Sequence, residues 1–186
     1  EKGGGVLLDL GVHAIDNAWF VMGCPRPVEA FGAMHTAFAH LAPKGIEYTA
    51  EDAAVGMIRF ENEATLDLMV TFALNTHGRD GEIPEGRSTP QWQDIRIYGT
   101  RGGIDVSGGH FIAGLKDGIK AAPFRLTRKY DPPFLMQARE FVRAVRAGDE
   151  PVNSAAQAVM LMQMLDALRK SGEAGRAVRI PQVDLH

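Results

Sequence analysis

The sequence has a single cysteine and no long uninterrupted apolar run, and both absences exclude classes of protein. Cys24 has no partner for an internal disulfide, which is typical of a reducing compartment, so we expect a cytoplasmic location. Asp9, His13 and Asp16 interrupt the one candidate for a membrane span, which needs ~18 to 20 apolar residues. We therefore expect no membrane partner.

An excess of positive charge is also missing. The 186 residues include 20 lysine and arginine residues against 23 aspartate and glutamate residues, which gives a formal net charge of −3. Nucleic-acid-binding domains ordinarily carry a clustered basic surface, so we expect no nucleic acid partner. The composition, 45% hydrophobic and 23% charged, is typical of a globular chain, and we expect a single domain over residues 1–186.

Two kinds of ligand-binding motif are missing as well. No G-x-G-x-x-G motif follows a strand pattern, and the glycines of Gly99–Gly103 are typical of a turn. No cluster of histidine and cysteine has the spacing of a metal site, so we expect no metal. The first residue is Glu1 rather than methionine, and the first helix begins almost at once, which favours a fragment of a longer protein.

Helices are expected at both ends of the chain. The first is predicted at Leu7–Met22, because Gly23 and Pro25 end it. Two closing helices are predicted at residues 134–147 and 155–170, and Ser154 and Gln157 have capping-box spacing at the start of the second. Helices at the ends and strands between them predict the α+β class, with an antiparallel sheet that the helices cover on at least one face.

The strands between the helices predict a sheet with two apolar faces. Alternation and tight turns indicate strands at residues 28–38, 53–60, 64–73, 95–98, 104–106, 111–115 and 124–129. In the third of these one face is apolar: Leu66, Leu68, Val70 and Phe72. The opposite face is mixed: Thr65, Asp67, Met69 and Thr71. In residues 53–60 both faces are largely apolar, so either a second subunit or an internal loop is expected on the face without helices.

The first helix carries a polar stripe on a mostly apolar surface. At about 100° per residue, Asp9, His13 and Asp16 lie within about 60° of one another, with Asn17 beside them. The stripe is too narrow for an ordinary solvent face, so something polar must meet it. A carboxylate four residues before a histidine can orient the imidazole as a general base. A polar contact with a loop and metal ligation remain open as alternatives.

Four stretches of the sequence resemble a known family. GGGVLLDLGVHAID, followed by GCPRPVEAFGAM, resembles the start of the C-terminal domain of the Gfo/Idh/MocA oxidoreductases. IRIYGTRGGIDV is similar to a strand-turn-strand of that domain, and PVNSAAQAVMLMQMLDALRKSGEAGRAVRI to its closing helix and strand. The resemblance implies an open, mostly antiparallel sheet with helices packed on one face. It also implies that the free face of the sheet forms contacts between subunits.

The same resemblance implies a catalytic role for the stripe. Asp9 and His13 would be the active-site pair, with His13 exchanging the proton of a substrate hydroxyl and Asp9 orienting the substrate or the imidazole. Asp16 and Asn17 of the stripe are also expected to bind substrate, as is Arg79 of the polar loop at residues 75–93, for which a solvated loop is the alternative. The chain would then be the substrate-binding and catalytic-base half of an NAD(P)-dependent oxidoreductase acting on a sugar, polyol or related hydroxylated compound.

The N-terminal Rossmann domain of this family, which binds NAD or NADP, is absent from the chain. We therefore expect the isolated chain to hold no cofactor, to be inactive and to leave its polar stripe open. The alternative is a non-catalytic ligand-binding or oligomerisation domain with the same fold. The stripe favours the enzyme, because an assembly module has no need of Asp9 and His13 together on a largely buried helix. In both cases a homo-oligomer through the sheet face is expected.

Overall fold

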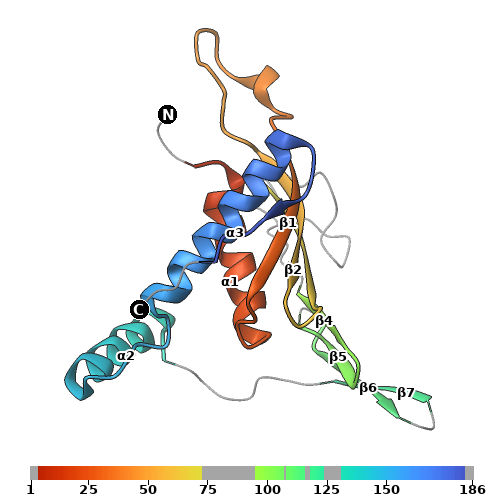
Figure 1. Ribbon diagram of the computed structural model, residues 1–186, viewed down its shortest axis with the longest axis vertical. Helices are drawn as coiled ribbons and strands as arrows, with labels where there is room; N and C mark the ends of the chain where they lie inside the picture. Colours follow the sequence, from red (N-terminus) through yellow and green to blue (C-terminus); the bar gives the residue numbers. More distant parts are fainter. Residues whose placement is uncertain (1–3, 73–94, 107, 116–117, 124–130, 183–186) are drawn as a thin grey trace, which may run out of the picture. The chain divides into compact units, whose positions relative to one another are not determined.

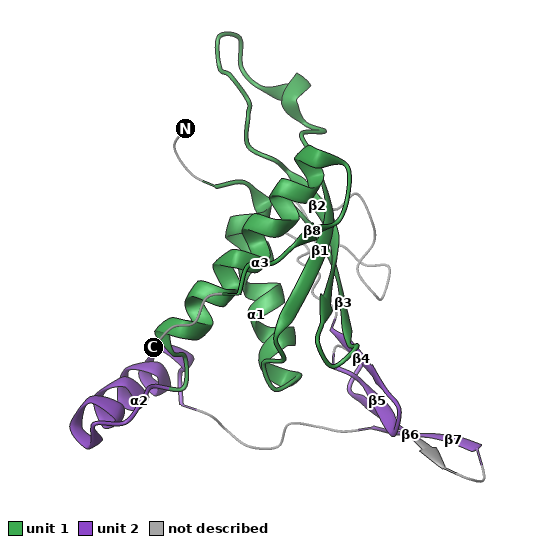
Figure 2. Cartoon of the chain, in the orientation of Figure 1, with its two compact units in different colours: residues 1–74, 152–186 green, residues 75–151 purple. Residues whose placement is uncertain are grey.

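The computed structural model describes residues 4–72, 95–106, 108–115, 118–123 and 131–182. The chain divides into two compact units, coloured separately in Figure 2. Unit 1 comprises residues 1–74 and 152–186, and unit 2 comprises residues 75–151. Every strand pairing among the described residues is antiparallel and helices accompany the strands, so the α+β class and the antiparallel sheet are confirmed.

Unit 1 is a four-stranded sheet with two helices on one face (Figure 1). Its helical elements are the π-helical turn η1 (Leu7–Gly11), α1 (Val12–Val21), the 3₁₀ turn η2 (Ala39–Leu41) and α3 (Ala155–Ala174). Its strands are β1 (Pro27–His35), β2 (Ala53–Phe60), β3 (Thr65–Thr71) and β8 (Val178–Arg179), in the order β3-β2-β1-β8. Consecutive strands therefore lie side by side, and β8 returns from the end of the chain to pair with β1.

Unit 2 contains a second four-stranded sheet and one helix. Its strands are β4 (Arg96–Gly99), β5 (Gly102–Asp105), β6 (His110–Leu115) and β7 (Gly118–Pro123), paired in chain order. The strand expected at residues 124–129 lies outside the described residues. The helix is α2 (Pro133–Ala147), in which Phe134, Phe141 and Val145 are 84%, 61% and 65% exposed. The apolar face of α2 is therefore uncovered in the part of the chain that the structure describes.

Alternate residues of β2 and β3 form the buried face of the unit 1 sheet. The core residues on these strands are Ala54, Ile58, Phe60, Leu66, Leu68 and Val70. Helices α1 and α3 cover them with Ile15, Trp19, Met164, Leu165 and Leu168. Burial of each large apolar side chain contributes about 1.5 to 3 kcal/mol, which holds the two helices on this face. The alternation expected from the sequence is confirmed within β2 and β3, but Phe72, expected on the same apolar face, follows the end of β3 and is 47% exposed.

Helix α3 crosses β1 closely because Gly32 has no side chain. A Cβ at Gly32 would lie 2.8 Å from the backbone oxygen of Leu168. Ser171 Oγ accepts the Gly32 N–H at 3.0 Å and donates to the carbonyl of Arg176 at 2.6 Å. Strand β8 pairs with β1 only at Glu29 and Ala30. The Ser171 hydroxyl therefore accepts the hydrogen bond of the Gly32 N–H, which lies beyond the end of β8.

Asp52 anchors the base of the long connection between β1 and β2. Its carboxylate is 1% exposed and accepts the N–H groups of Ala37 at 3.0 Å and Phe38 at 2.8 Å, and the Tyr48 hydroxyl at 3.2 Å. Since these two amides bind the carboxylate rather than a neighbouring strand, β1 ends at His35. The predicted end at residue 38 is therefore three residues too far along the chain.

Asp52 should make the stability of the chain sensitive to acid. Burial raises the pKa of Asp52, but the hydrogen bonds from Phe38, Ala37 and Tyr48 outweigh it and hold the pKa below its ordinary value. Such a group stabilises fully above the unfolded pKa of about 3.9, and this contribution is lost as pH falls through the lower folded pKa. We expect Asp52→Asn to lower the free energy of unfolding at neutral pH by about 1 to 3 kcal/mol, because an amide nitrogen would face a backbone N–H.

Urea unfolding from neutral to acid pH tests this expectation. The difference between wild type and Asp52→Asn should shrink toward the acid end, because the wild-type carboxylate is then protonated. Asp67→Asn, at an exposed position of β3, is the matched control and should change stability little. Parallel stability curves for wild type and Asp52→Asn would contradict the assignment.

Candidate functional site

The outward side of η1 and α1 carries the polar stripe. Leu7, Gly11, Ile15 and Trp19 recur every four residues and are buried, so the opposite side of the helix faces away from the sheet. On that side Asp9, His13 and Asn17 are exposed, and Asp16 at its border is half-buried. None of these four side chains has a hydrogen bond or ion pair with another described residue. The stripe is thus available to a ligand or partner.

Asp9 lies in a π-helical turn rather than in regular α-helix. The Val12 N–H donates to the carbonyl of Leu7, five residues earlier, and the Gly5 carbonyl accepts the N–H groups of both Leu8 and Asp9 at 3.1 Å. A π-turn is wider than an α-helical turn, so residues four apart come closer to one line along the axis. Asp9 and His13 therefore leave the helix on the same side. Such turns are frequent at functional sites.

Cys24 closes the far end of α1 and packs against the core of unit 1. Its N–H donates to the carbonyl of Trp19 at 2.9 Å, and the Trp19 indole N–H donates to the carbonyl of Pro25 at 2.7 Å. Burial raises the pKa of the Cys24 thiol, although the side-chain amide of Gln157, which donates to the sulfur at 3.5 Å, acts to lower it. The thiol is therefore protonated at neutral pH and serves packing.

A small hollow adjoins the stripe at Asp16. Its volume is about 120 Å³, and it lies between α1 and the start of α3. Asp16, Trp19 and Phe20 line it from α1, and Ser154 and Gln157 line it from the capping box of α3. This space suits a few water molecules or one small substituent rather than a whole sugar. The polar stripe consequently continues into a shallow recess at its C-terminal end.

Comparison with protein families identifies the kind of domain that contains this helix. The family model described as the GFO/IDH/MocA C-terminal domain matches residues 1–105, which include the stripe and all of β1 to β5. The chain belongs to this family. Residues Asp9 and His13 thus lie in a GFO/IDH/MocA domain, and the resemblance identified in the sequence is confirmed.

Relatives of this GFO/IDH/MocA domain are about twice its length. D-glucoside 3-dehydrogenase of Escherichia coli (strain K12) is 25% identical over 188 residues, a match that covers 96% of this chain and 50% of the relative. The oxidoreductase domain protein of Kribbella flavida has 23% identity and a TM-score of 0.74, with 98% of this chain and 52% of the other covered. Levoglucosan dehydrogenase in complex with NADH and levoglucosan has 20% identity and a TM-score of 0.70, with 97% and 51% covered. The chain spans about half the length of these relatives.

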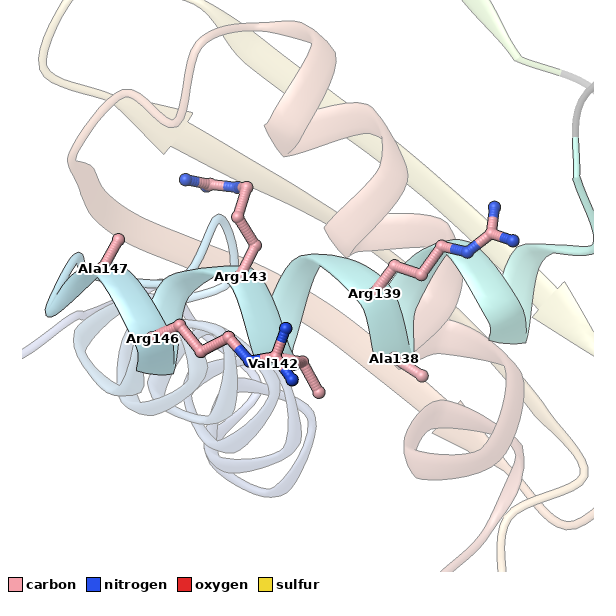
Figure 3. Close-up of a pocket in the computed structure, with 6 residues that line it drawn as sticks. All are labelled: Ala138, Arg139, Val142, Arg143, Arg146 and Ala147. Carbon is pink, nitrogen blue, oxygen red and sulfur yellow. The ribbon is translucent and has the colours of Figure 1, made fainter.

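A second hollow, formed by residues of unit 2, lies along α2. Figure 3 shows its six lining residues, all of them on that one helix: Ala138, Arg139, Val142, Arg143, Arg146 and Ala147. Two of the guanidinium groups have carboxylate partners, since Arg139 pairs with Asp131 and Arg143 pairs with Glu140 and Asp149. A ligand site needs polar groups that converge from several sides. This groove, about 640 Å³ in volume, is lined by one helix and is not assigned as the site.

The structure brings together most of the predicted site residues. Asp9, His13, Asp16 and Asn17 share the outward side of one helix, whereas Arg79 lies outside the described residues. Within the described ranges no group of three or more metal-binding side chains could hold an ion, and no helix there is long and apolar enough to cross a membrane. No sequence pattern marks Glu51 as part of the site, although its carboxylate lies at the start of η1.

Proposed function

We propose that this chain is the substrate-binding and catalytic-base half of an NAD(P)-dependent oxidoreductase acting on a sugar, polyol or related hydroxylated compound. The observation that carries the proposal is the exposed pair of Asp9 and His13 at the π-turn, with no hydrogen-bond partner among the described residues. The names of the relatives support the substrate class, since one is a D-glucoside 3-dehydrogenase and another was solved with levoglucosan.

The chemistry that this chain can supply is proton transfer and orientation. Oxidation of an alcohol removes a proton from oxygen and a hydride from carbon. A ring nitrogen of His13 would accept the proton, and the carboxylate of Asp9, on the same side of the helix, would orient the imidazole or accept a hydrogen bond from a second hydroxyl of the substrate. Asp16 and Asn17, further along the same side, would bind neighbouring hydroxyls, because a carboxylate accepts hydrogen bonds and an amide both donates and accepts them.

The described residues do not fit the binding of a dinucleotide. The glycine-rich turn at Gly99–Gly103 joins the antiparallel strands β4 and β5, whereas a phosphate-binding turn joins a strand to the N-terminus of a helix. This geometry supports a hydride acceptor that is held outside these residues. We propose that sequence beyond this chain, a Rossmann domain, binds the NAD or NADP and that the isolated chain is inactive.

Cofactor reduction by the full-length protein tests the proposal. NAD and NADP should each be offered with a panel of pyranosides, free aldoses and cyclic polyols, and one class of hydroxylated compound should support turnover. Residues 1–186 alone should not reduce either cofactor with any compound of the panel. Turnover by the isolated chain, or full-length activity that does not depend on His13, would contradict the assignment.

The outer face of the unit 1 sheet supports a proposal about assembly. Four of its side chains are large, apolar and exposed: Phe31 (50%), Val55 (40%), Met57 (48%) and Met69 (63%). They are neighbours by register, since Phe31 pairs with Met57 and Val55 pairs with Met69. We propose that this outer-face patch contacts a second copy of the chain, because contiguous apolar surface on a sheet is typical of subunit interfaces.

Replacing one residue of the outer-face patch should weaken self-association. In the full-length protein Met57→Asp should raise the dissociation constant of the oligomer at least about tenfold, because it would bury a charge without a partner. Sedimentation equilibrium measures this change. Ile46→Asp, at an apolar residue 63% exposed on the β1–β2 connection, is the control and should leave the mass unchanged. A monomeric wild type would contradict the proposal.

A further inference from the structure

Glu51 caps the start of the helix that carries Asp9. Its backbone carbonyl accepts the N–H of Val6 at 2.9 Å, and its Oε1 accepts the N–H of Leu7 at 3.3 Å. The first amides of a helix have no acceptor within the helix itself. Glu51 supplies acceptors for two of them, and its negative charge suits the positive end of the helix dipole.

The backbone that carries Glu51 is itself fixed on the sheet. The next residue, Asp52, donates its N–H to His35 at 2.9 Å and accepts the N–H of Phe72 at 2.9 Å. The Asp52 side chain is held by three further hydrogen bonds on the β1–β2 connection. Glu51 thus links the start of η1 to the ends of three strands, β1, β2 and β3.

Gly5 makes the space for the Glu51 carboxylate. A Cβ at Gly5 would overlap Cδ and both carboxylate oxygens of Glu51. Gly5 is buried, and its carbonyl accepts the N–H of Asp9 at 3.1 Å. Gly5 therefore lies between the Glu51 carboxylate and the backbone of Asp9. A displacement of the Glu51 carboxylate can move the backbone of Asp9 through this one residue.

We propose that Glu51 is a positioning residue that sets the direction of Asp9 by holding the π-turn through the Leu7 amide and the space at Gly5. The inference rests on the proposed function and adds a residue to it. Glu51 acts through the backbone of Leu7 and Gly5. Displacement of a substrate-binding group by about 1 Å can reduce the rate about 10²-fold, so a support of this kind matters for turnover.

Two substitutions break the same contact from opposite sides. Glu51→Ala removes the carboxylate, whereas Gly5→Ala keeps it and pushes it away, because the overlap involves only the end of a flexible side chain. Each should lower kcat of the full-length protein by about tenfold, and the double variant should be no slower than either single variant. Glu51→Gln keeps an acceptor for the Leu7 N–H and should restore most of the activity.

A control and a second measurement separate positioning from stability. Ser171→Ala removes the hydroxyl that holds Gly32 and should lower stability without lowering kcat. Hydrogen exchange of residues 6–12 in the full-length protein should become faster in Glu51→Ala and Gly5→Ala alike, because both release the π-turn. Losses of kcat that add in the double variant, or an unchanged kcat with faster exchange, would overturn the inference.

The outcome for the proposed function is read separately. If His13→Ala retains full activity, the proposed chemistry fails whatever the Glu51 variants do. Hydrogen exchange then still tests the structural part of the inference. Faster exchange of residues 6–12 in both variants would show that Glu51 stabilises the π-turn. Unchanged exchange would overturn that part. If His13→Ala is inactive while the Glu51 and Gly5 variants turn over normally, only the positioning role fails.

Discussion

Replacement of His13 by alanine in the full-length protein is expected to lower kcat/KM by about 10²- to 10⁴-fold, the contribution typical of a positioned general base. The side chain is exposed and has no hydrogen bond with another described residue, so its removal should leave the fold intact. Most of the loss should appear in kcat, because the proton is transferred in the transition state. Steady-state kinetics of cofactor reduction measure both constants.

An exposed histidine away from the stripe provides the control. His40 lies on the β1–β2 connection, where its Nδ1 is 3.0 Å from the carbonyl of Ala37. His40→Ala should keep wild-type kcat and KM. Wild-type turnover by His13→Ala would remove the catalytic interpretation of the stripe and favour the alternative of a ligand-binding or oligomerisation domain.

Replacement of Gly32 by valine is expected to lower the free energy of unfolding by about 3 kcal/mol or more, the upper range for overpacking a core. The new Cβ would lie 2.8 Å from the Leu168 carbonyl oxygen, which is backbone and cannot rotate away. Relief would require α3 to move off β1, and the hydrogen bond from the Gly32 N–H to Ser171 would then be lost as well. Urea unfolding of the full-length protein measures the change.

The neighbouring residue gives a matched control for Gly32. Ala33 follows on the same strand, is half-buried on the opposite face and pairs with Val55. Ala33→Val should change the free energy of unfolding by less than about 0.5 kcal/mol, because valine suits an extended strand and residue 33 is only half-buried. Equal destabilisation by the two substitutions would show that strand composition, rather than the approach of α3, limits residue 32.

Local patterns in the sequence predict the parts of the site that depend on one helix. The repeat of Leu7, Gly11, Ile15 and Trp19 defines the inward side, and the glycine at position 23 has a left-handed φ of 81° where the helix ends. Because side-chain directions in a helix follow from spacing alone, the shared side of Asp9 and His13 follows from their separation. The faces of β2 and β3 are predictable for the same reason.

Features that depend on contacts between distant residues could not be predicted. The hydrogen bond from Leu7 to Glu51 spans 44 positions, and no pattern near Glu51 marks it as part of the site. The early end of β1 depends on Asp52, 14 and 15 positions after the amides that it binds. The division of the strands into two sheets likewise depends on pairing rather than on propensity. A role for Arg79 stays a prediction.

The shortness of β8 bears on how copies of the chain could aggregate. An exposed strand edge offers free amides to a strand of another molecule, and proteins blunt such edges to avoid open-ended polymers. Here β8 occupies the edge of β1 for two residue pairs, and the Ser171 hydroxyl already binds the next amide, that of Gly32. A foreign strand added at this position would have to displace an internal hydroxyl. Edge-to-edge growth into fibres is therefore disfavoured at β1. Pairing at this edge then competes less with a closed assembly formed through the face of the sheet.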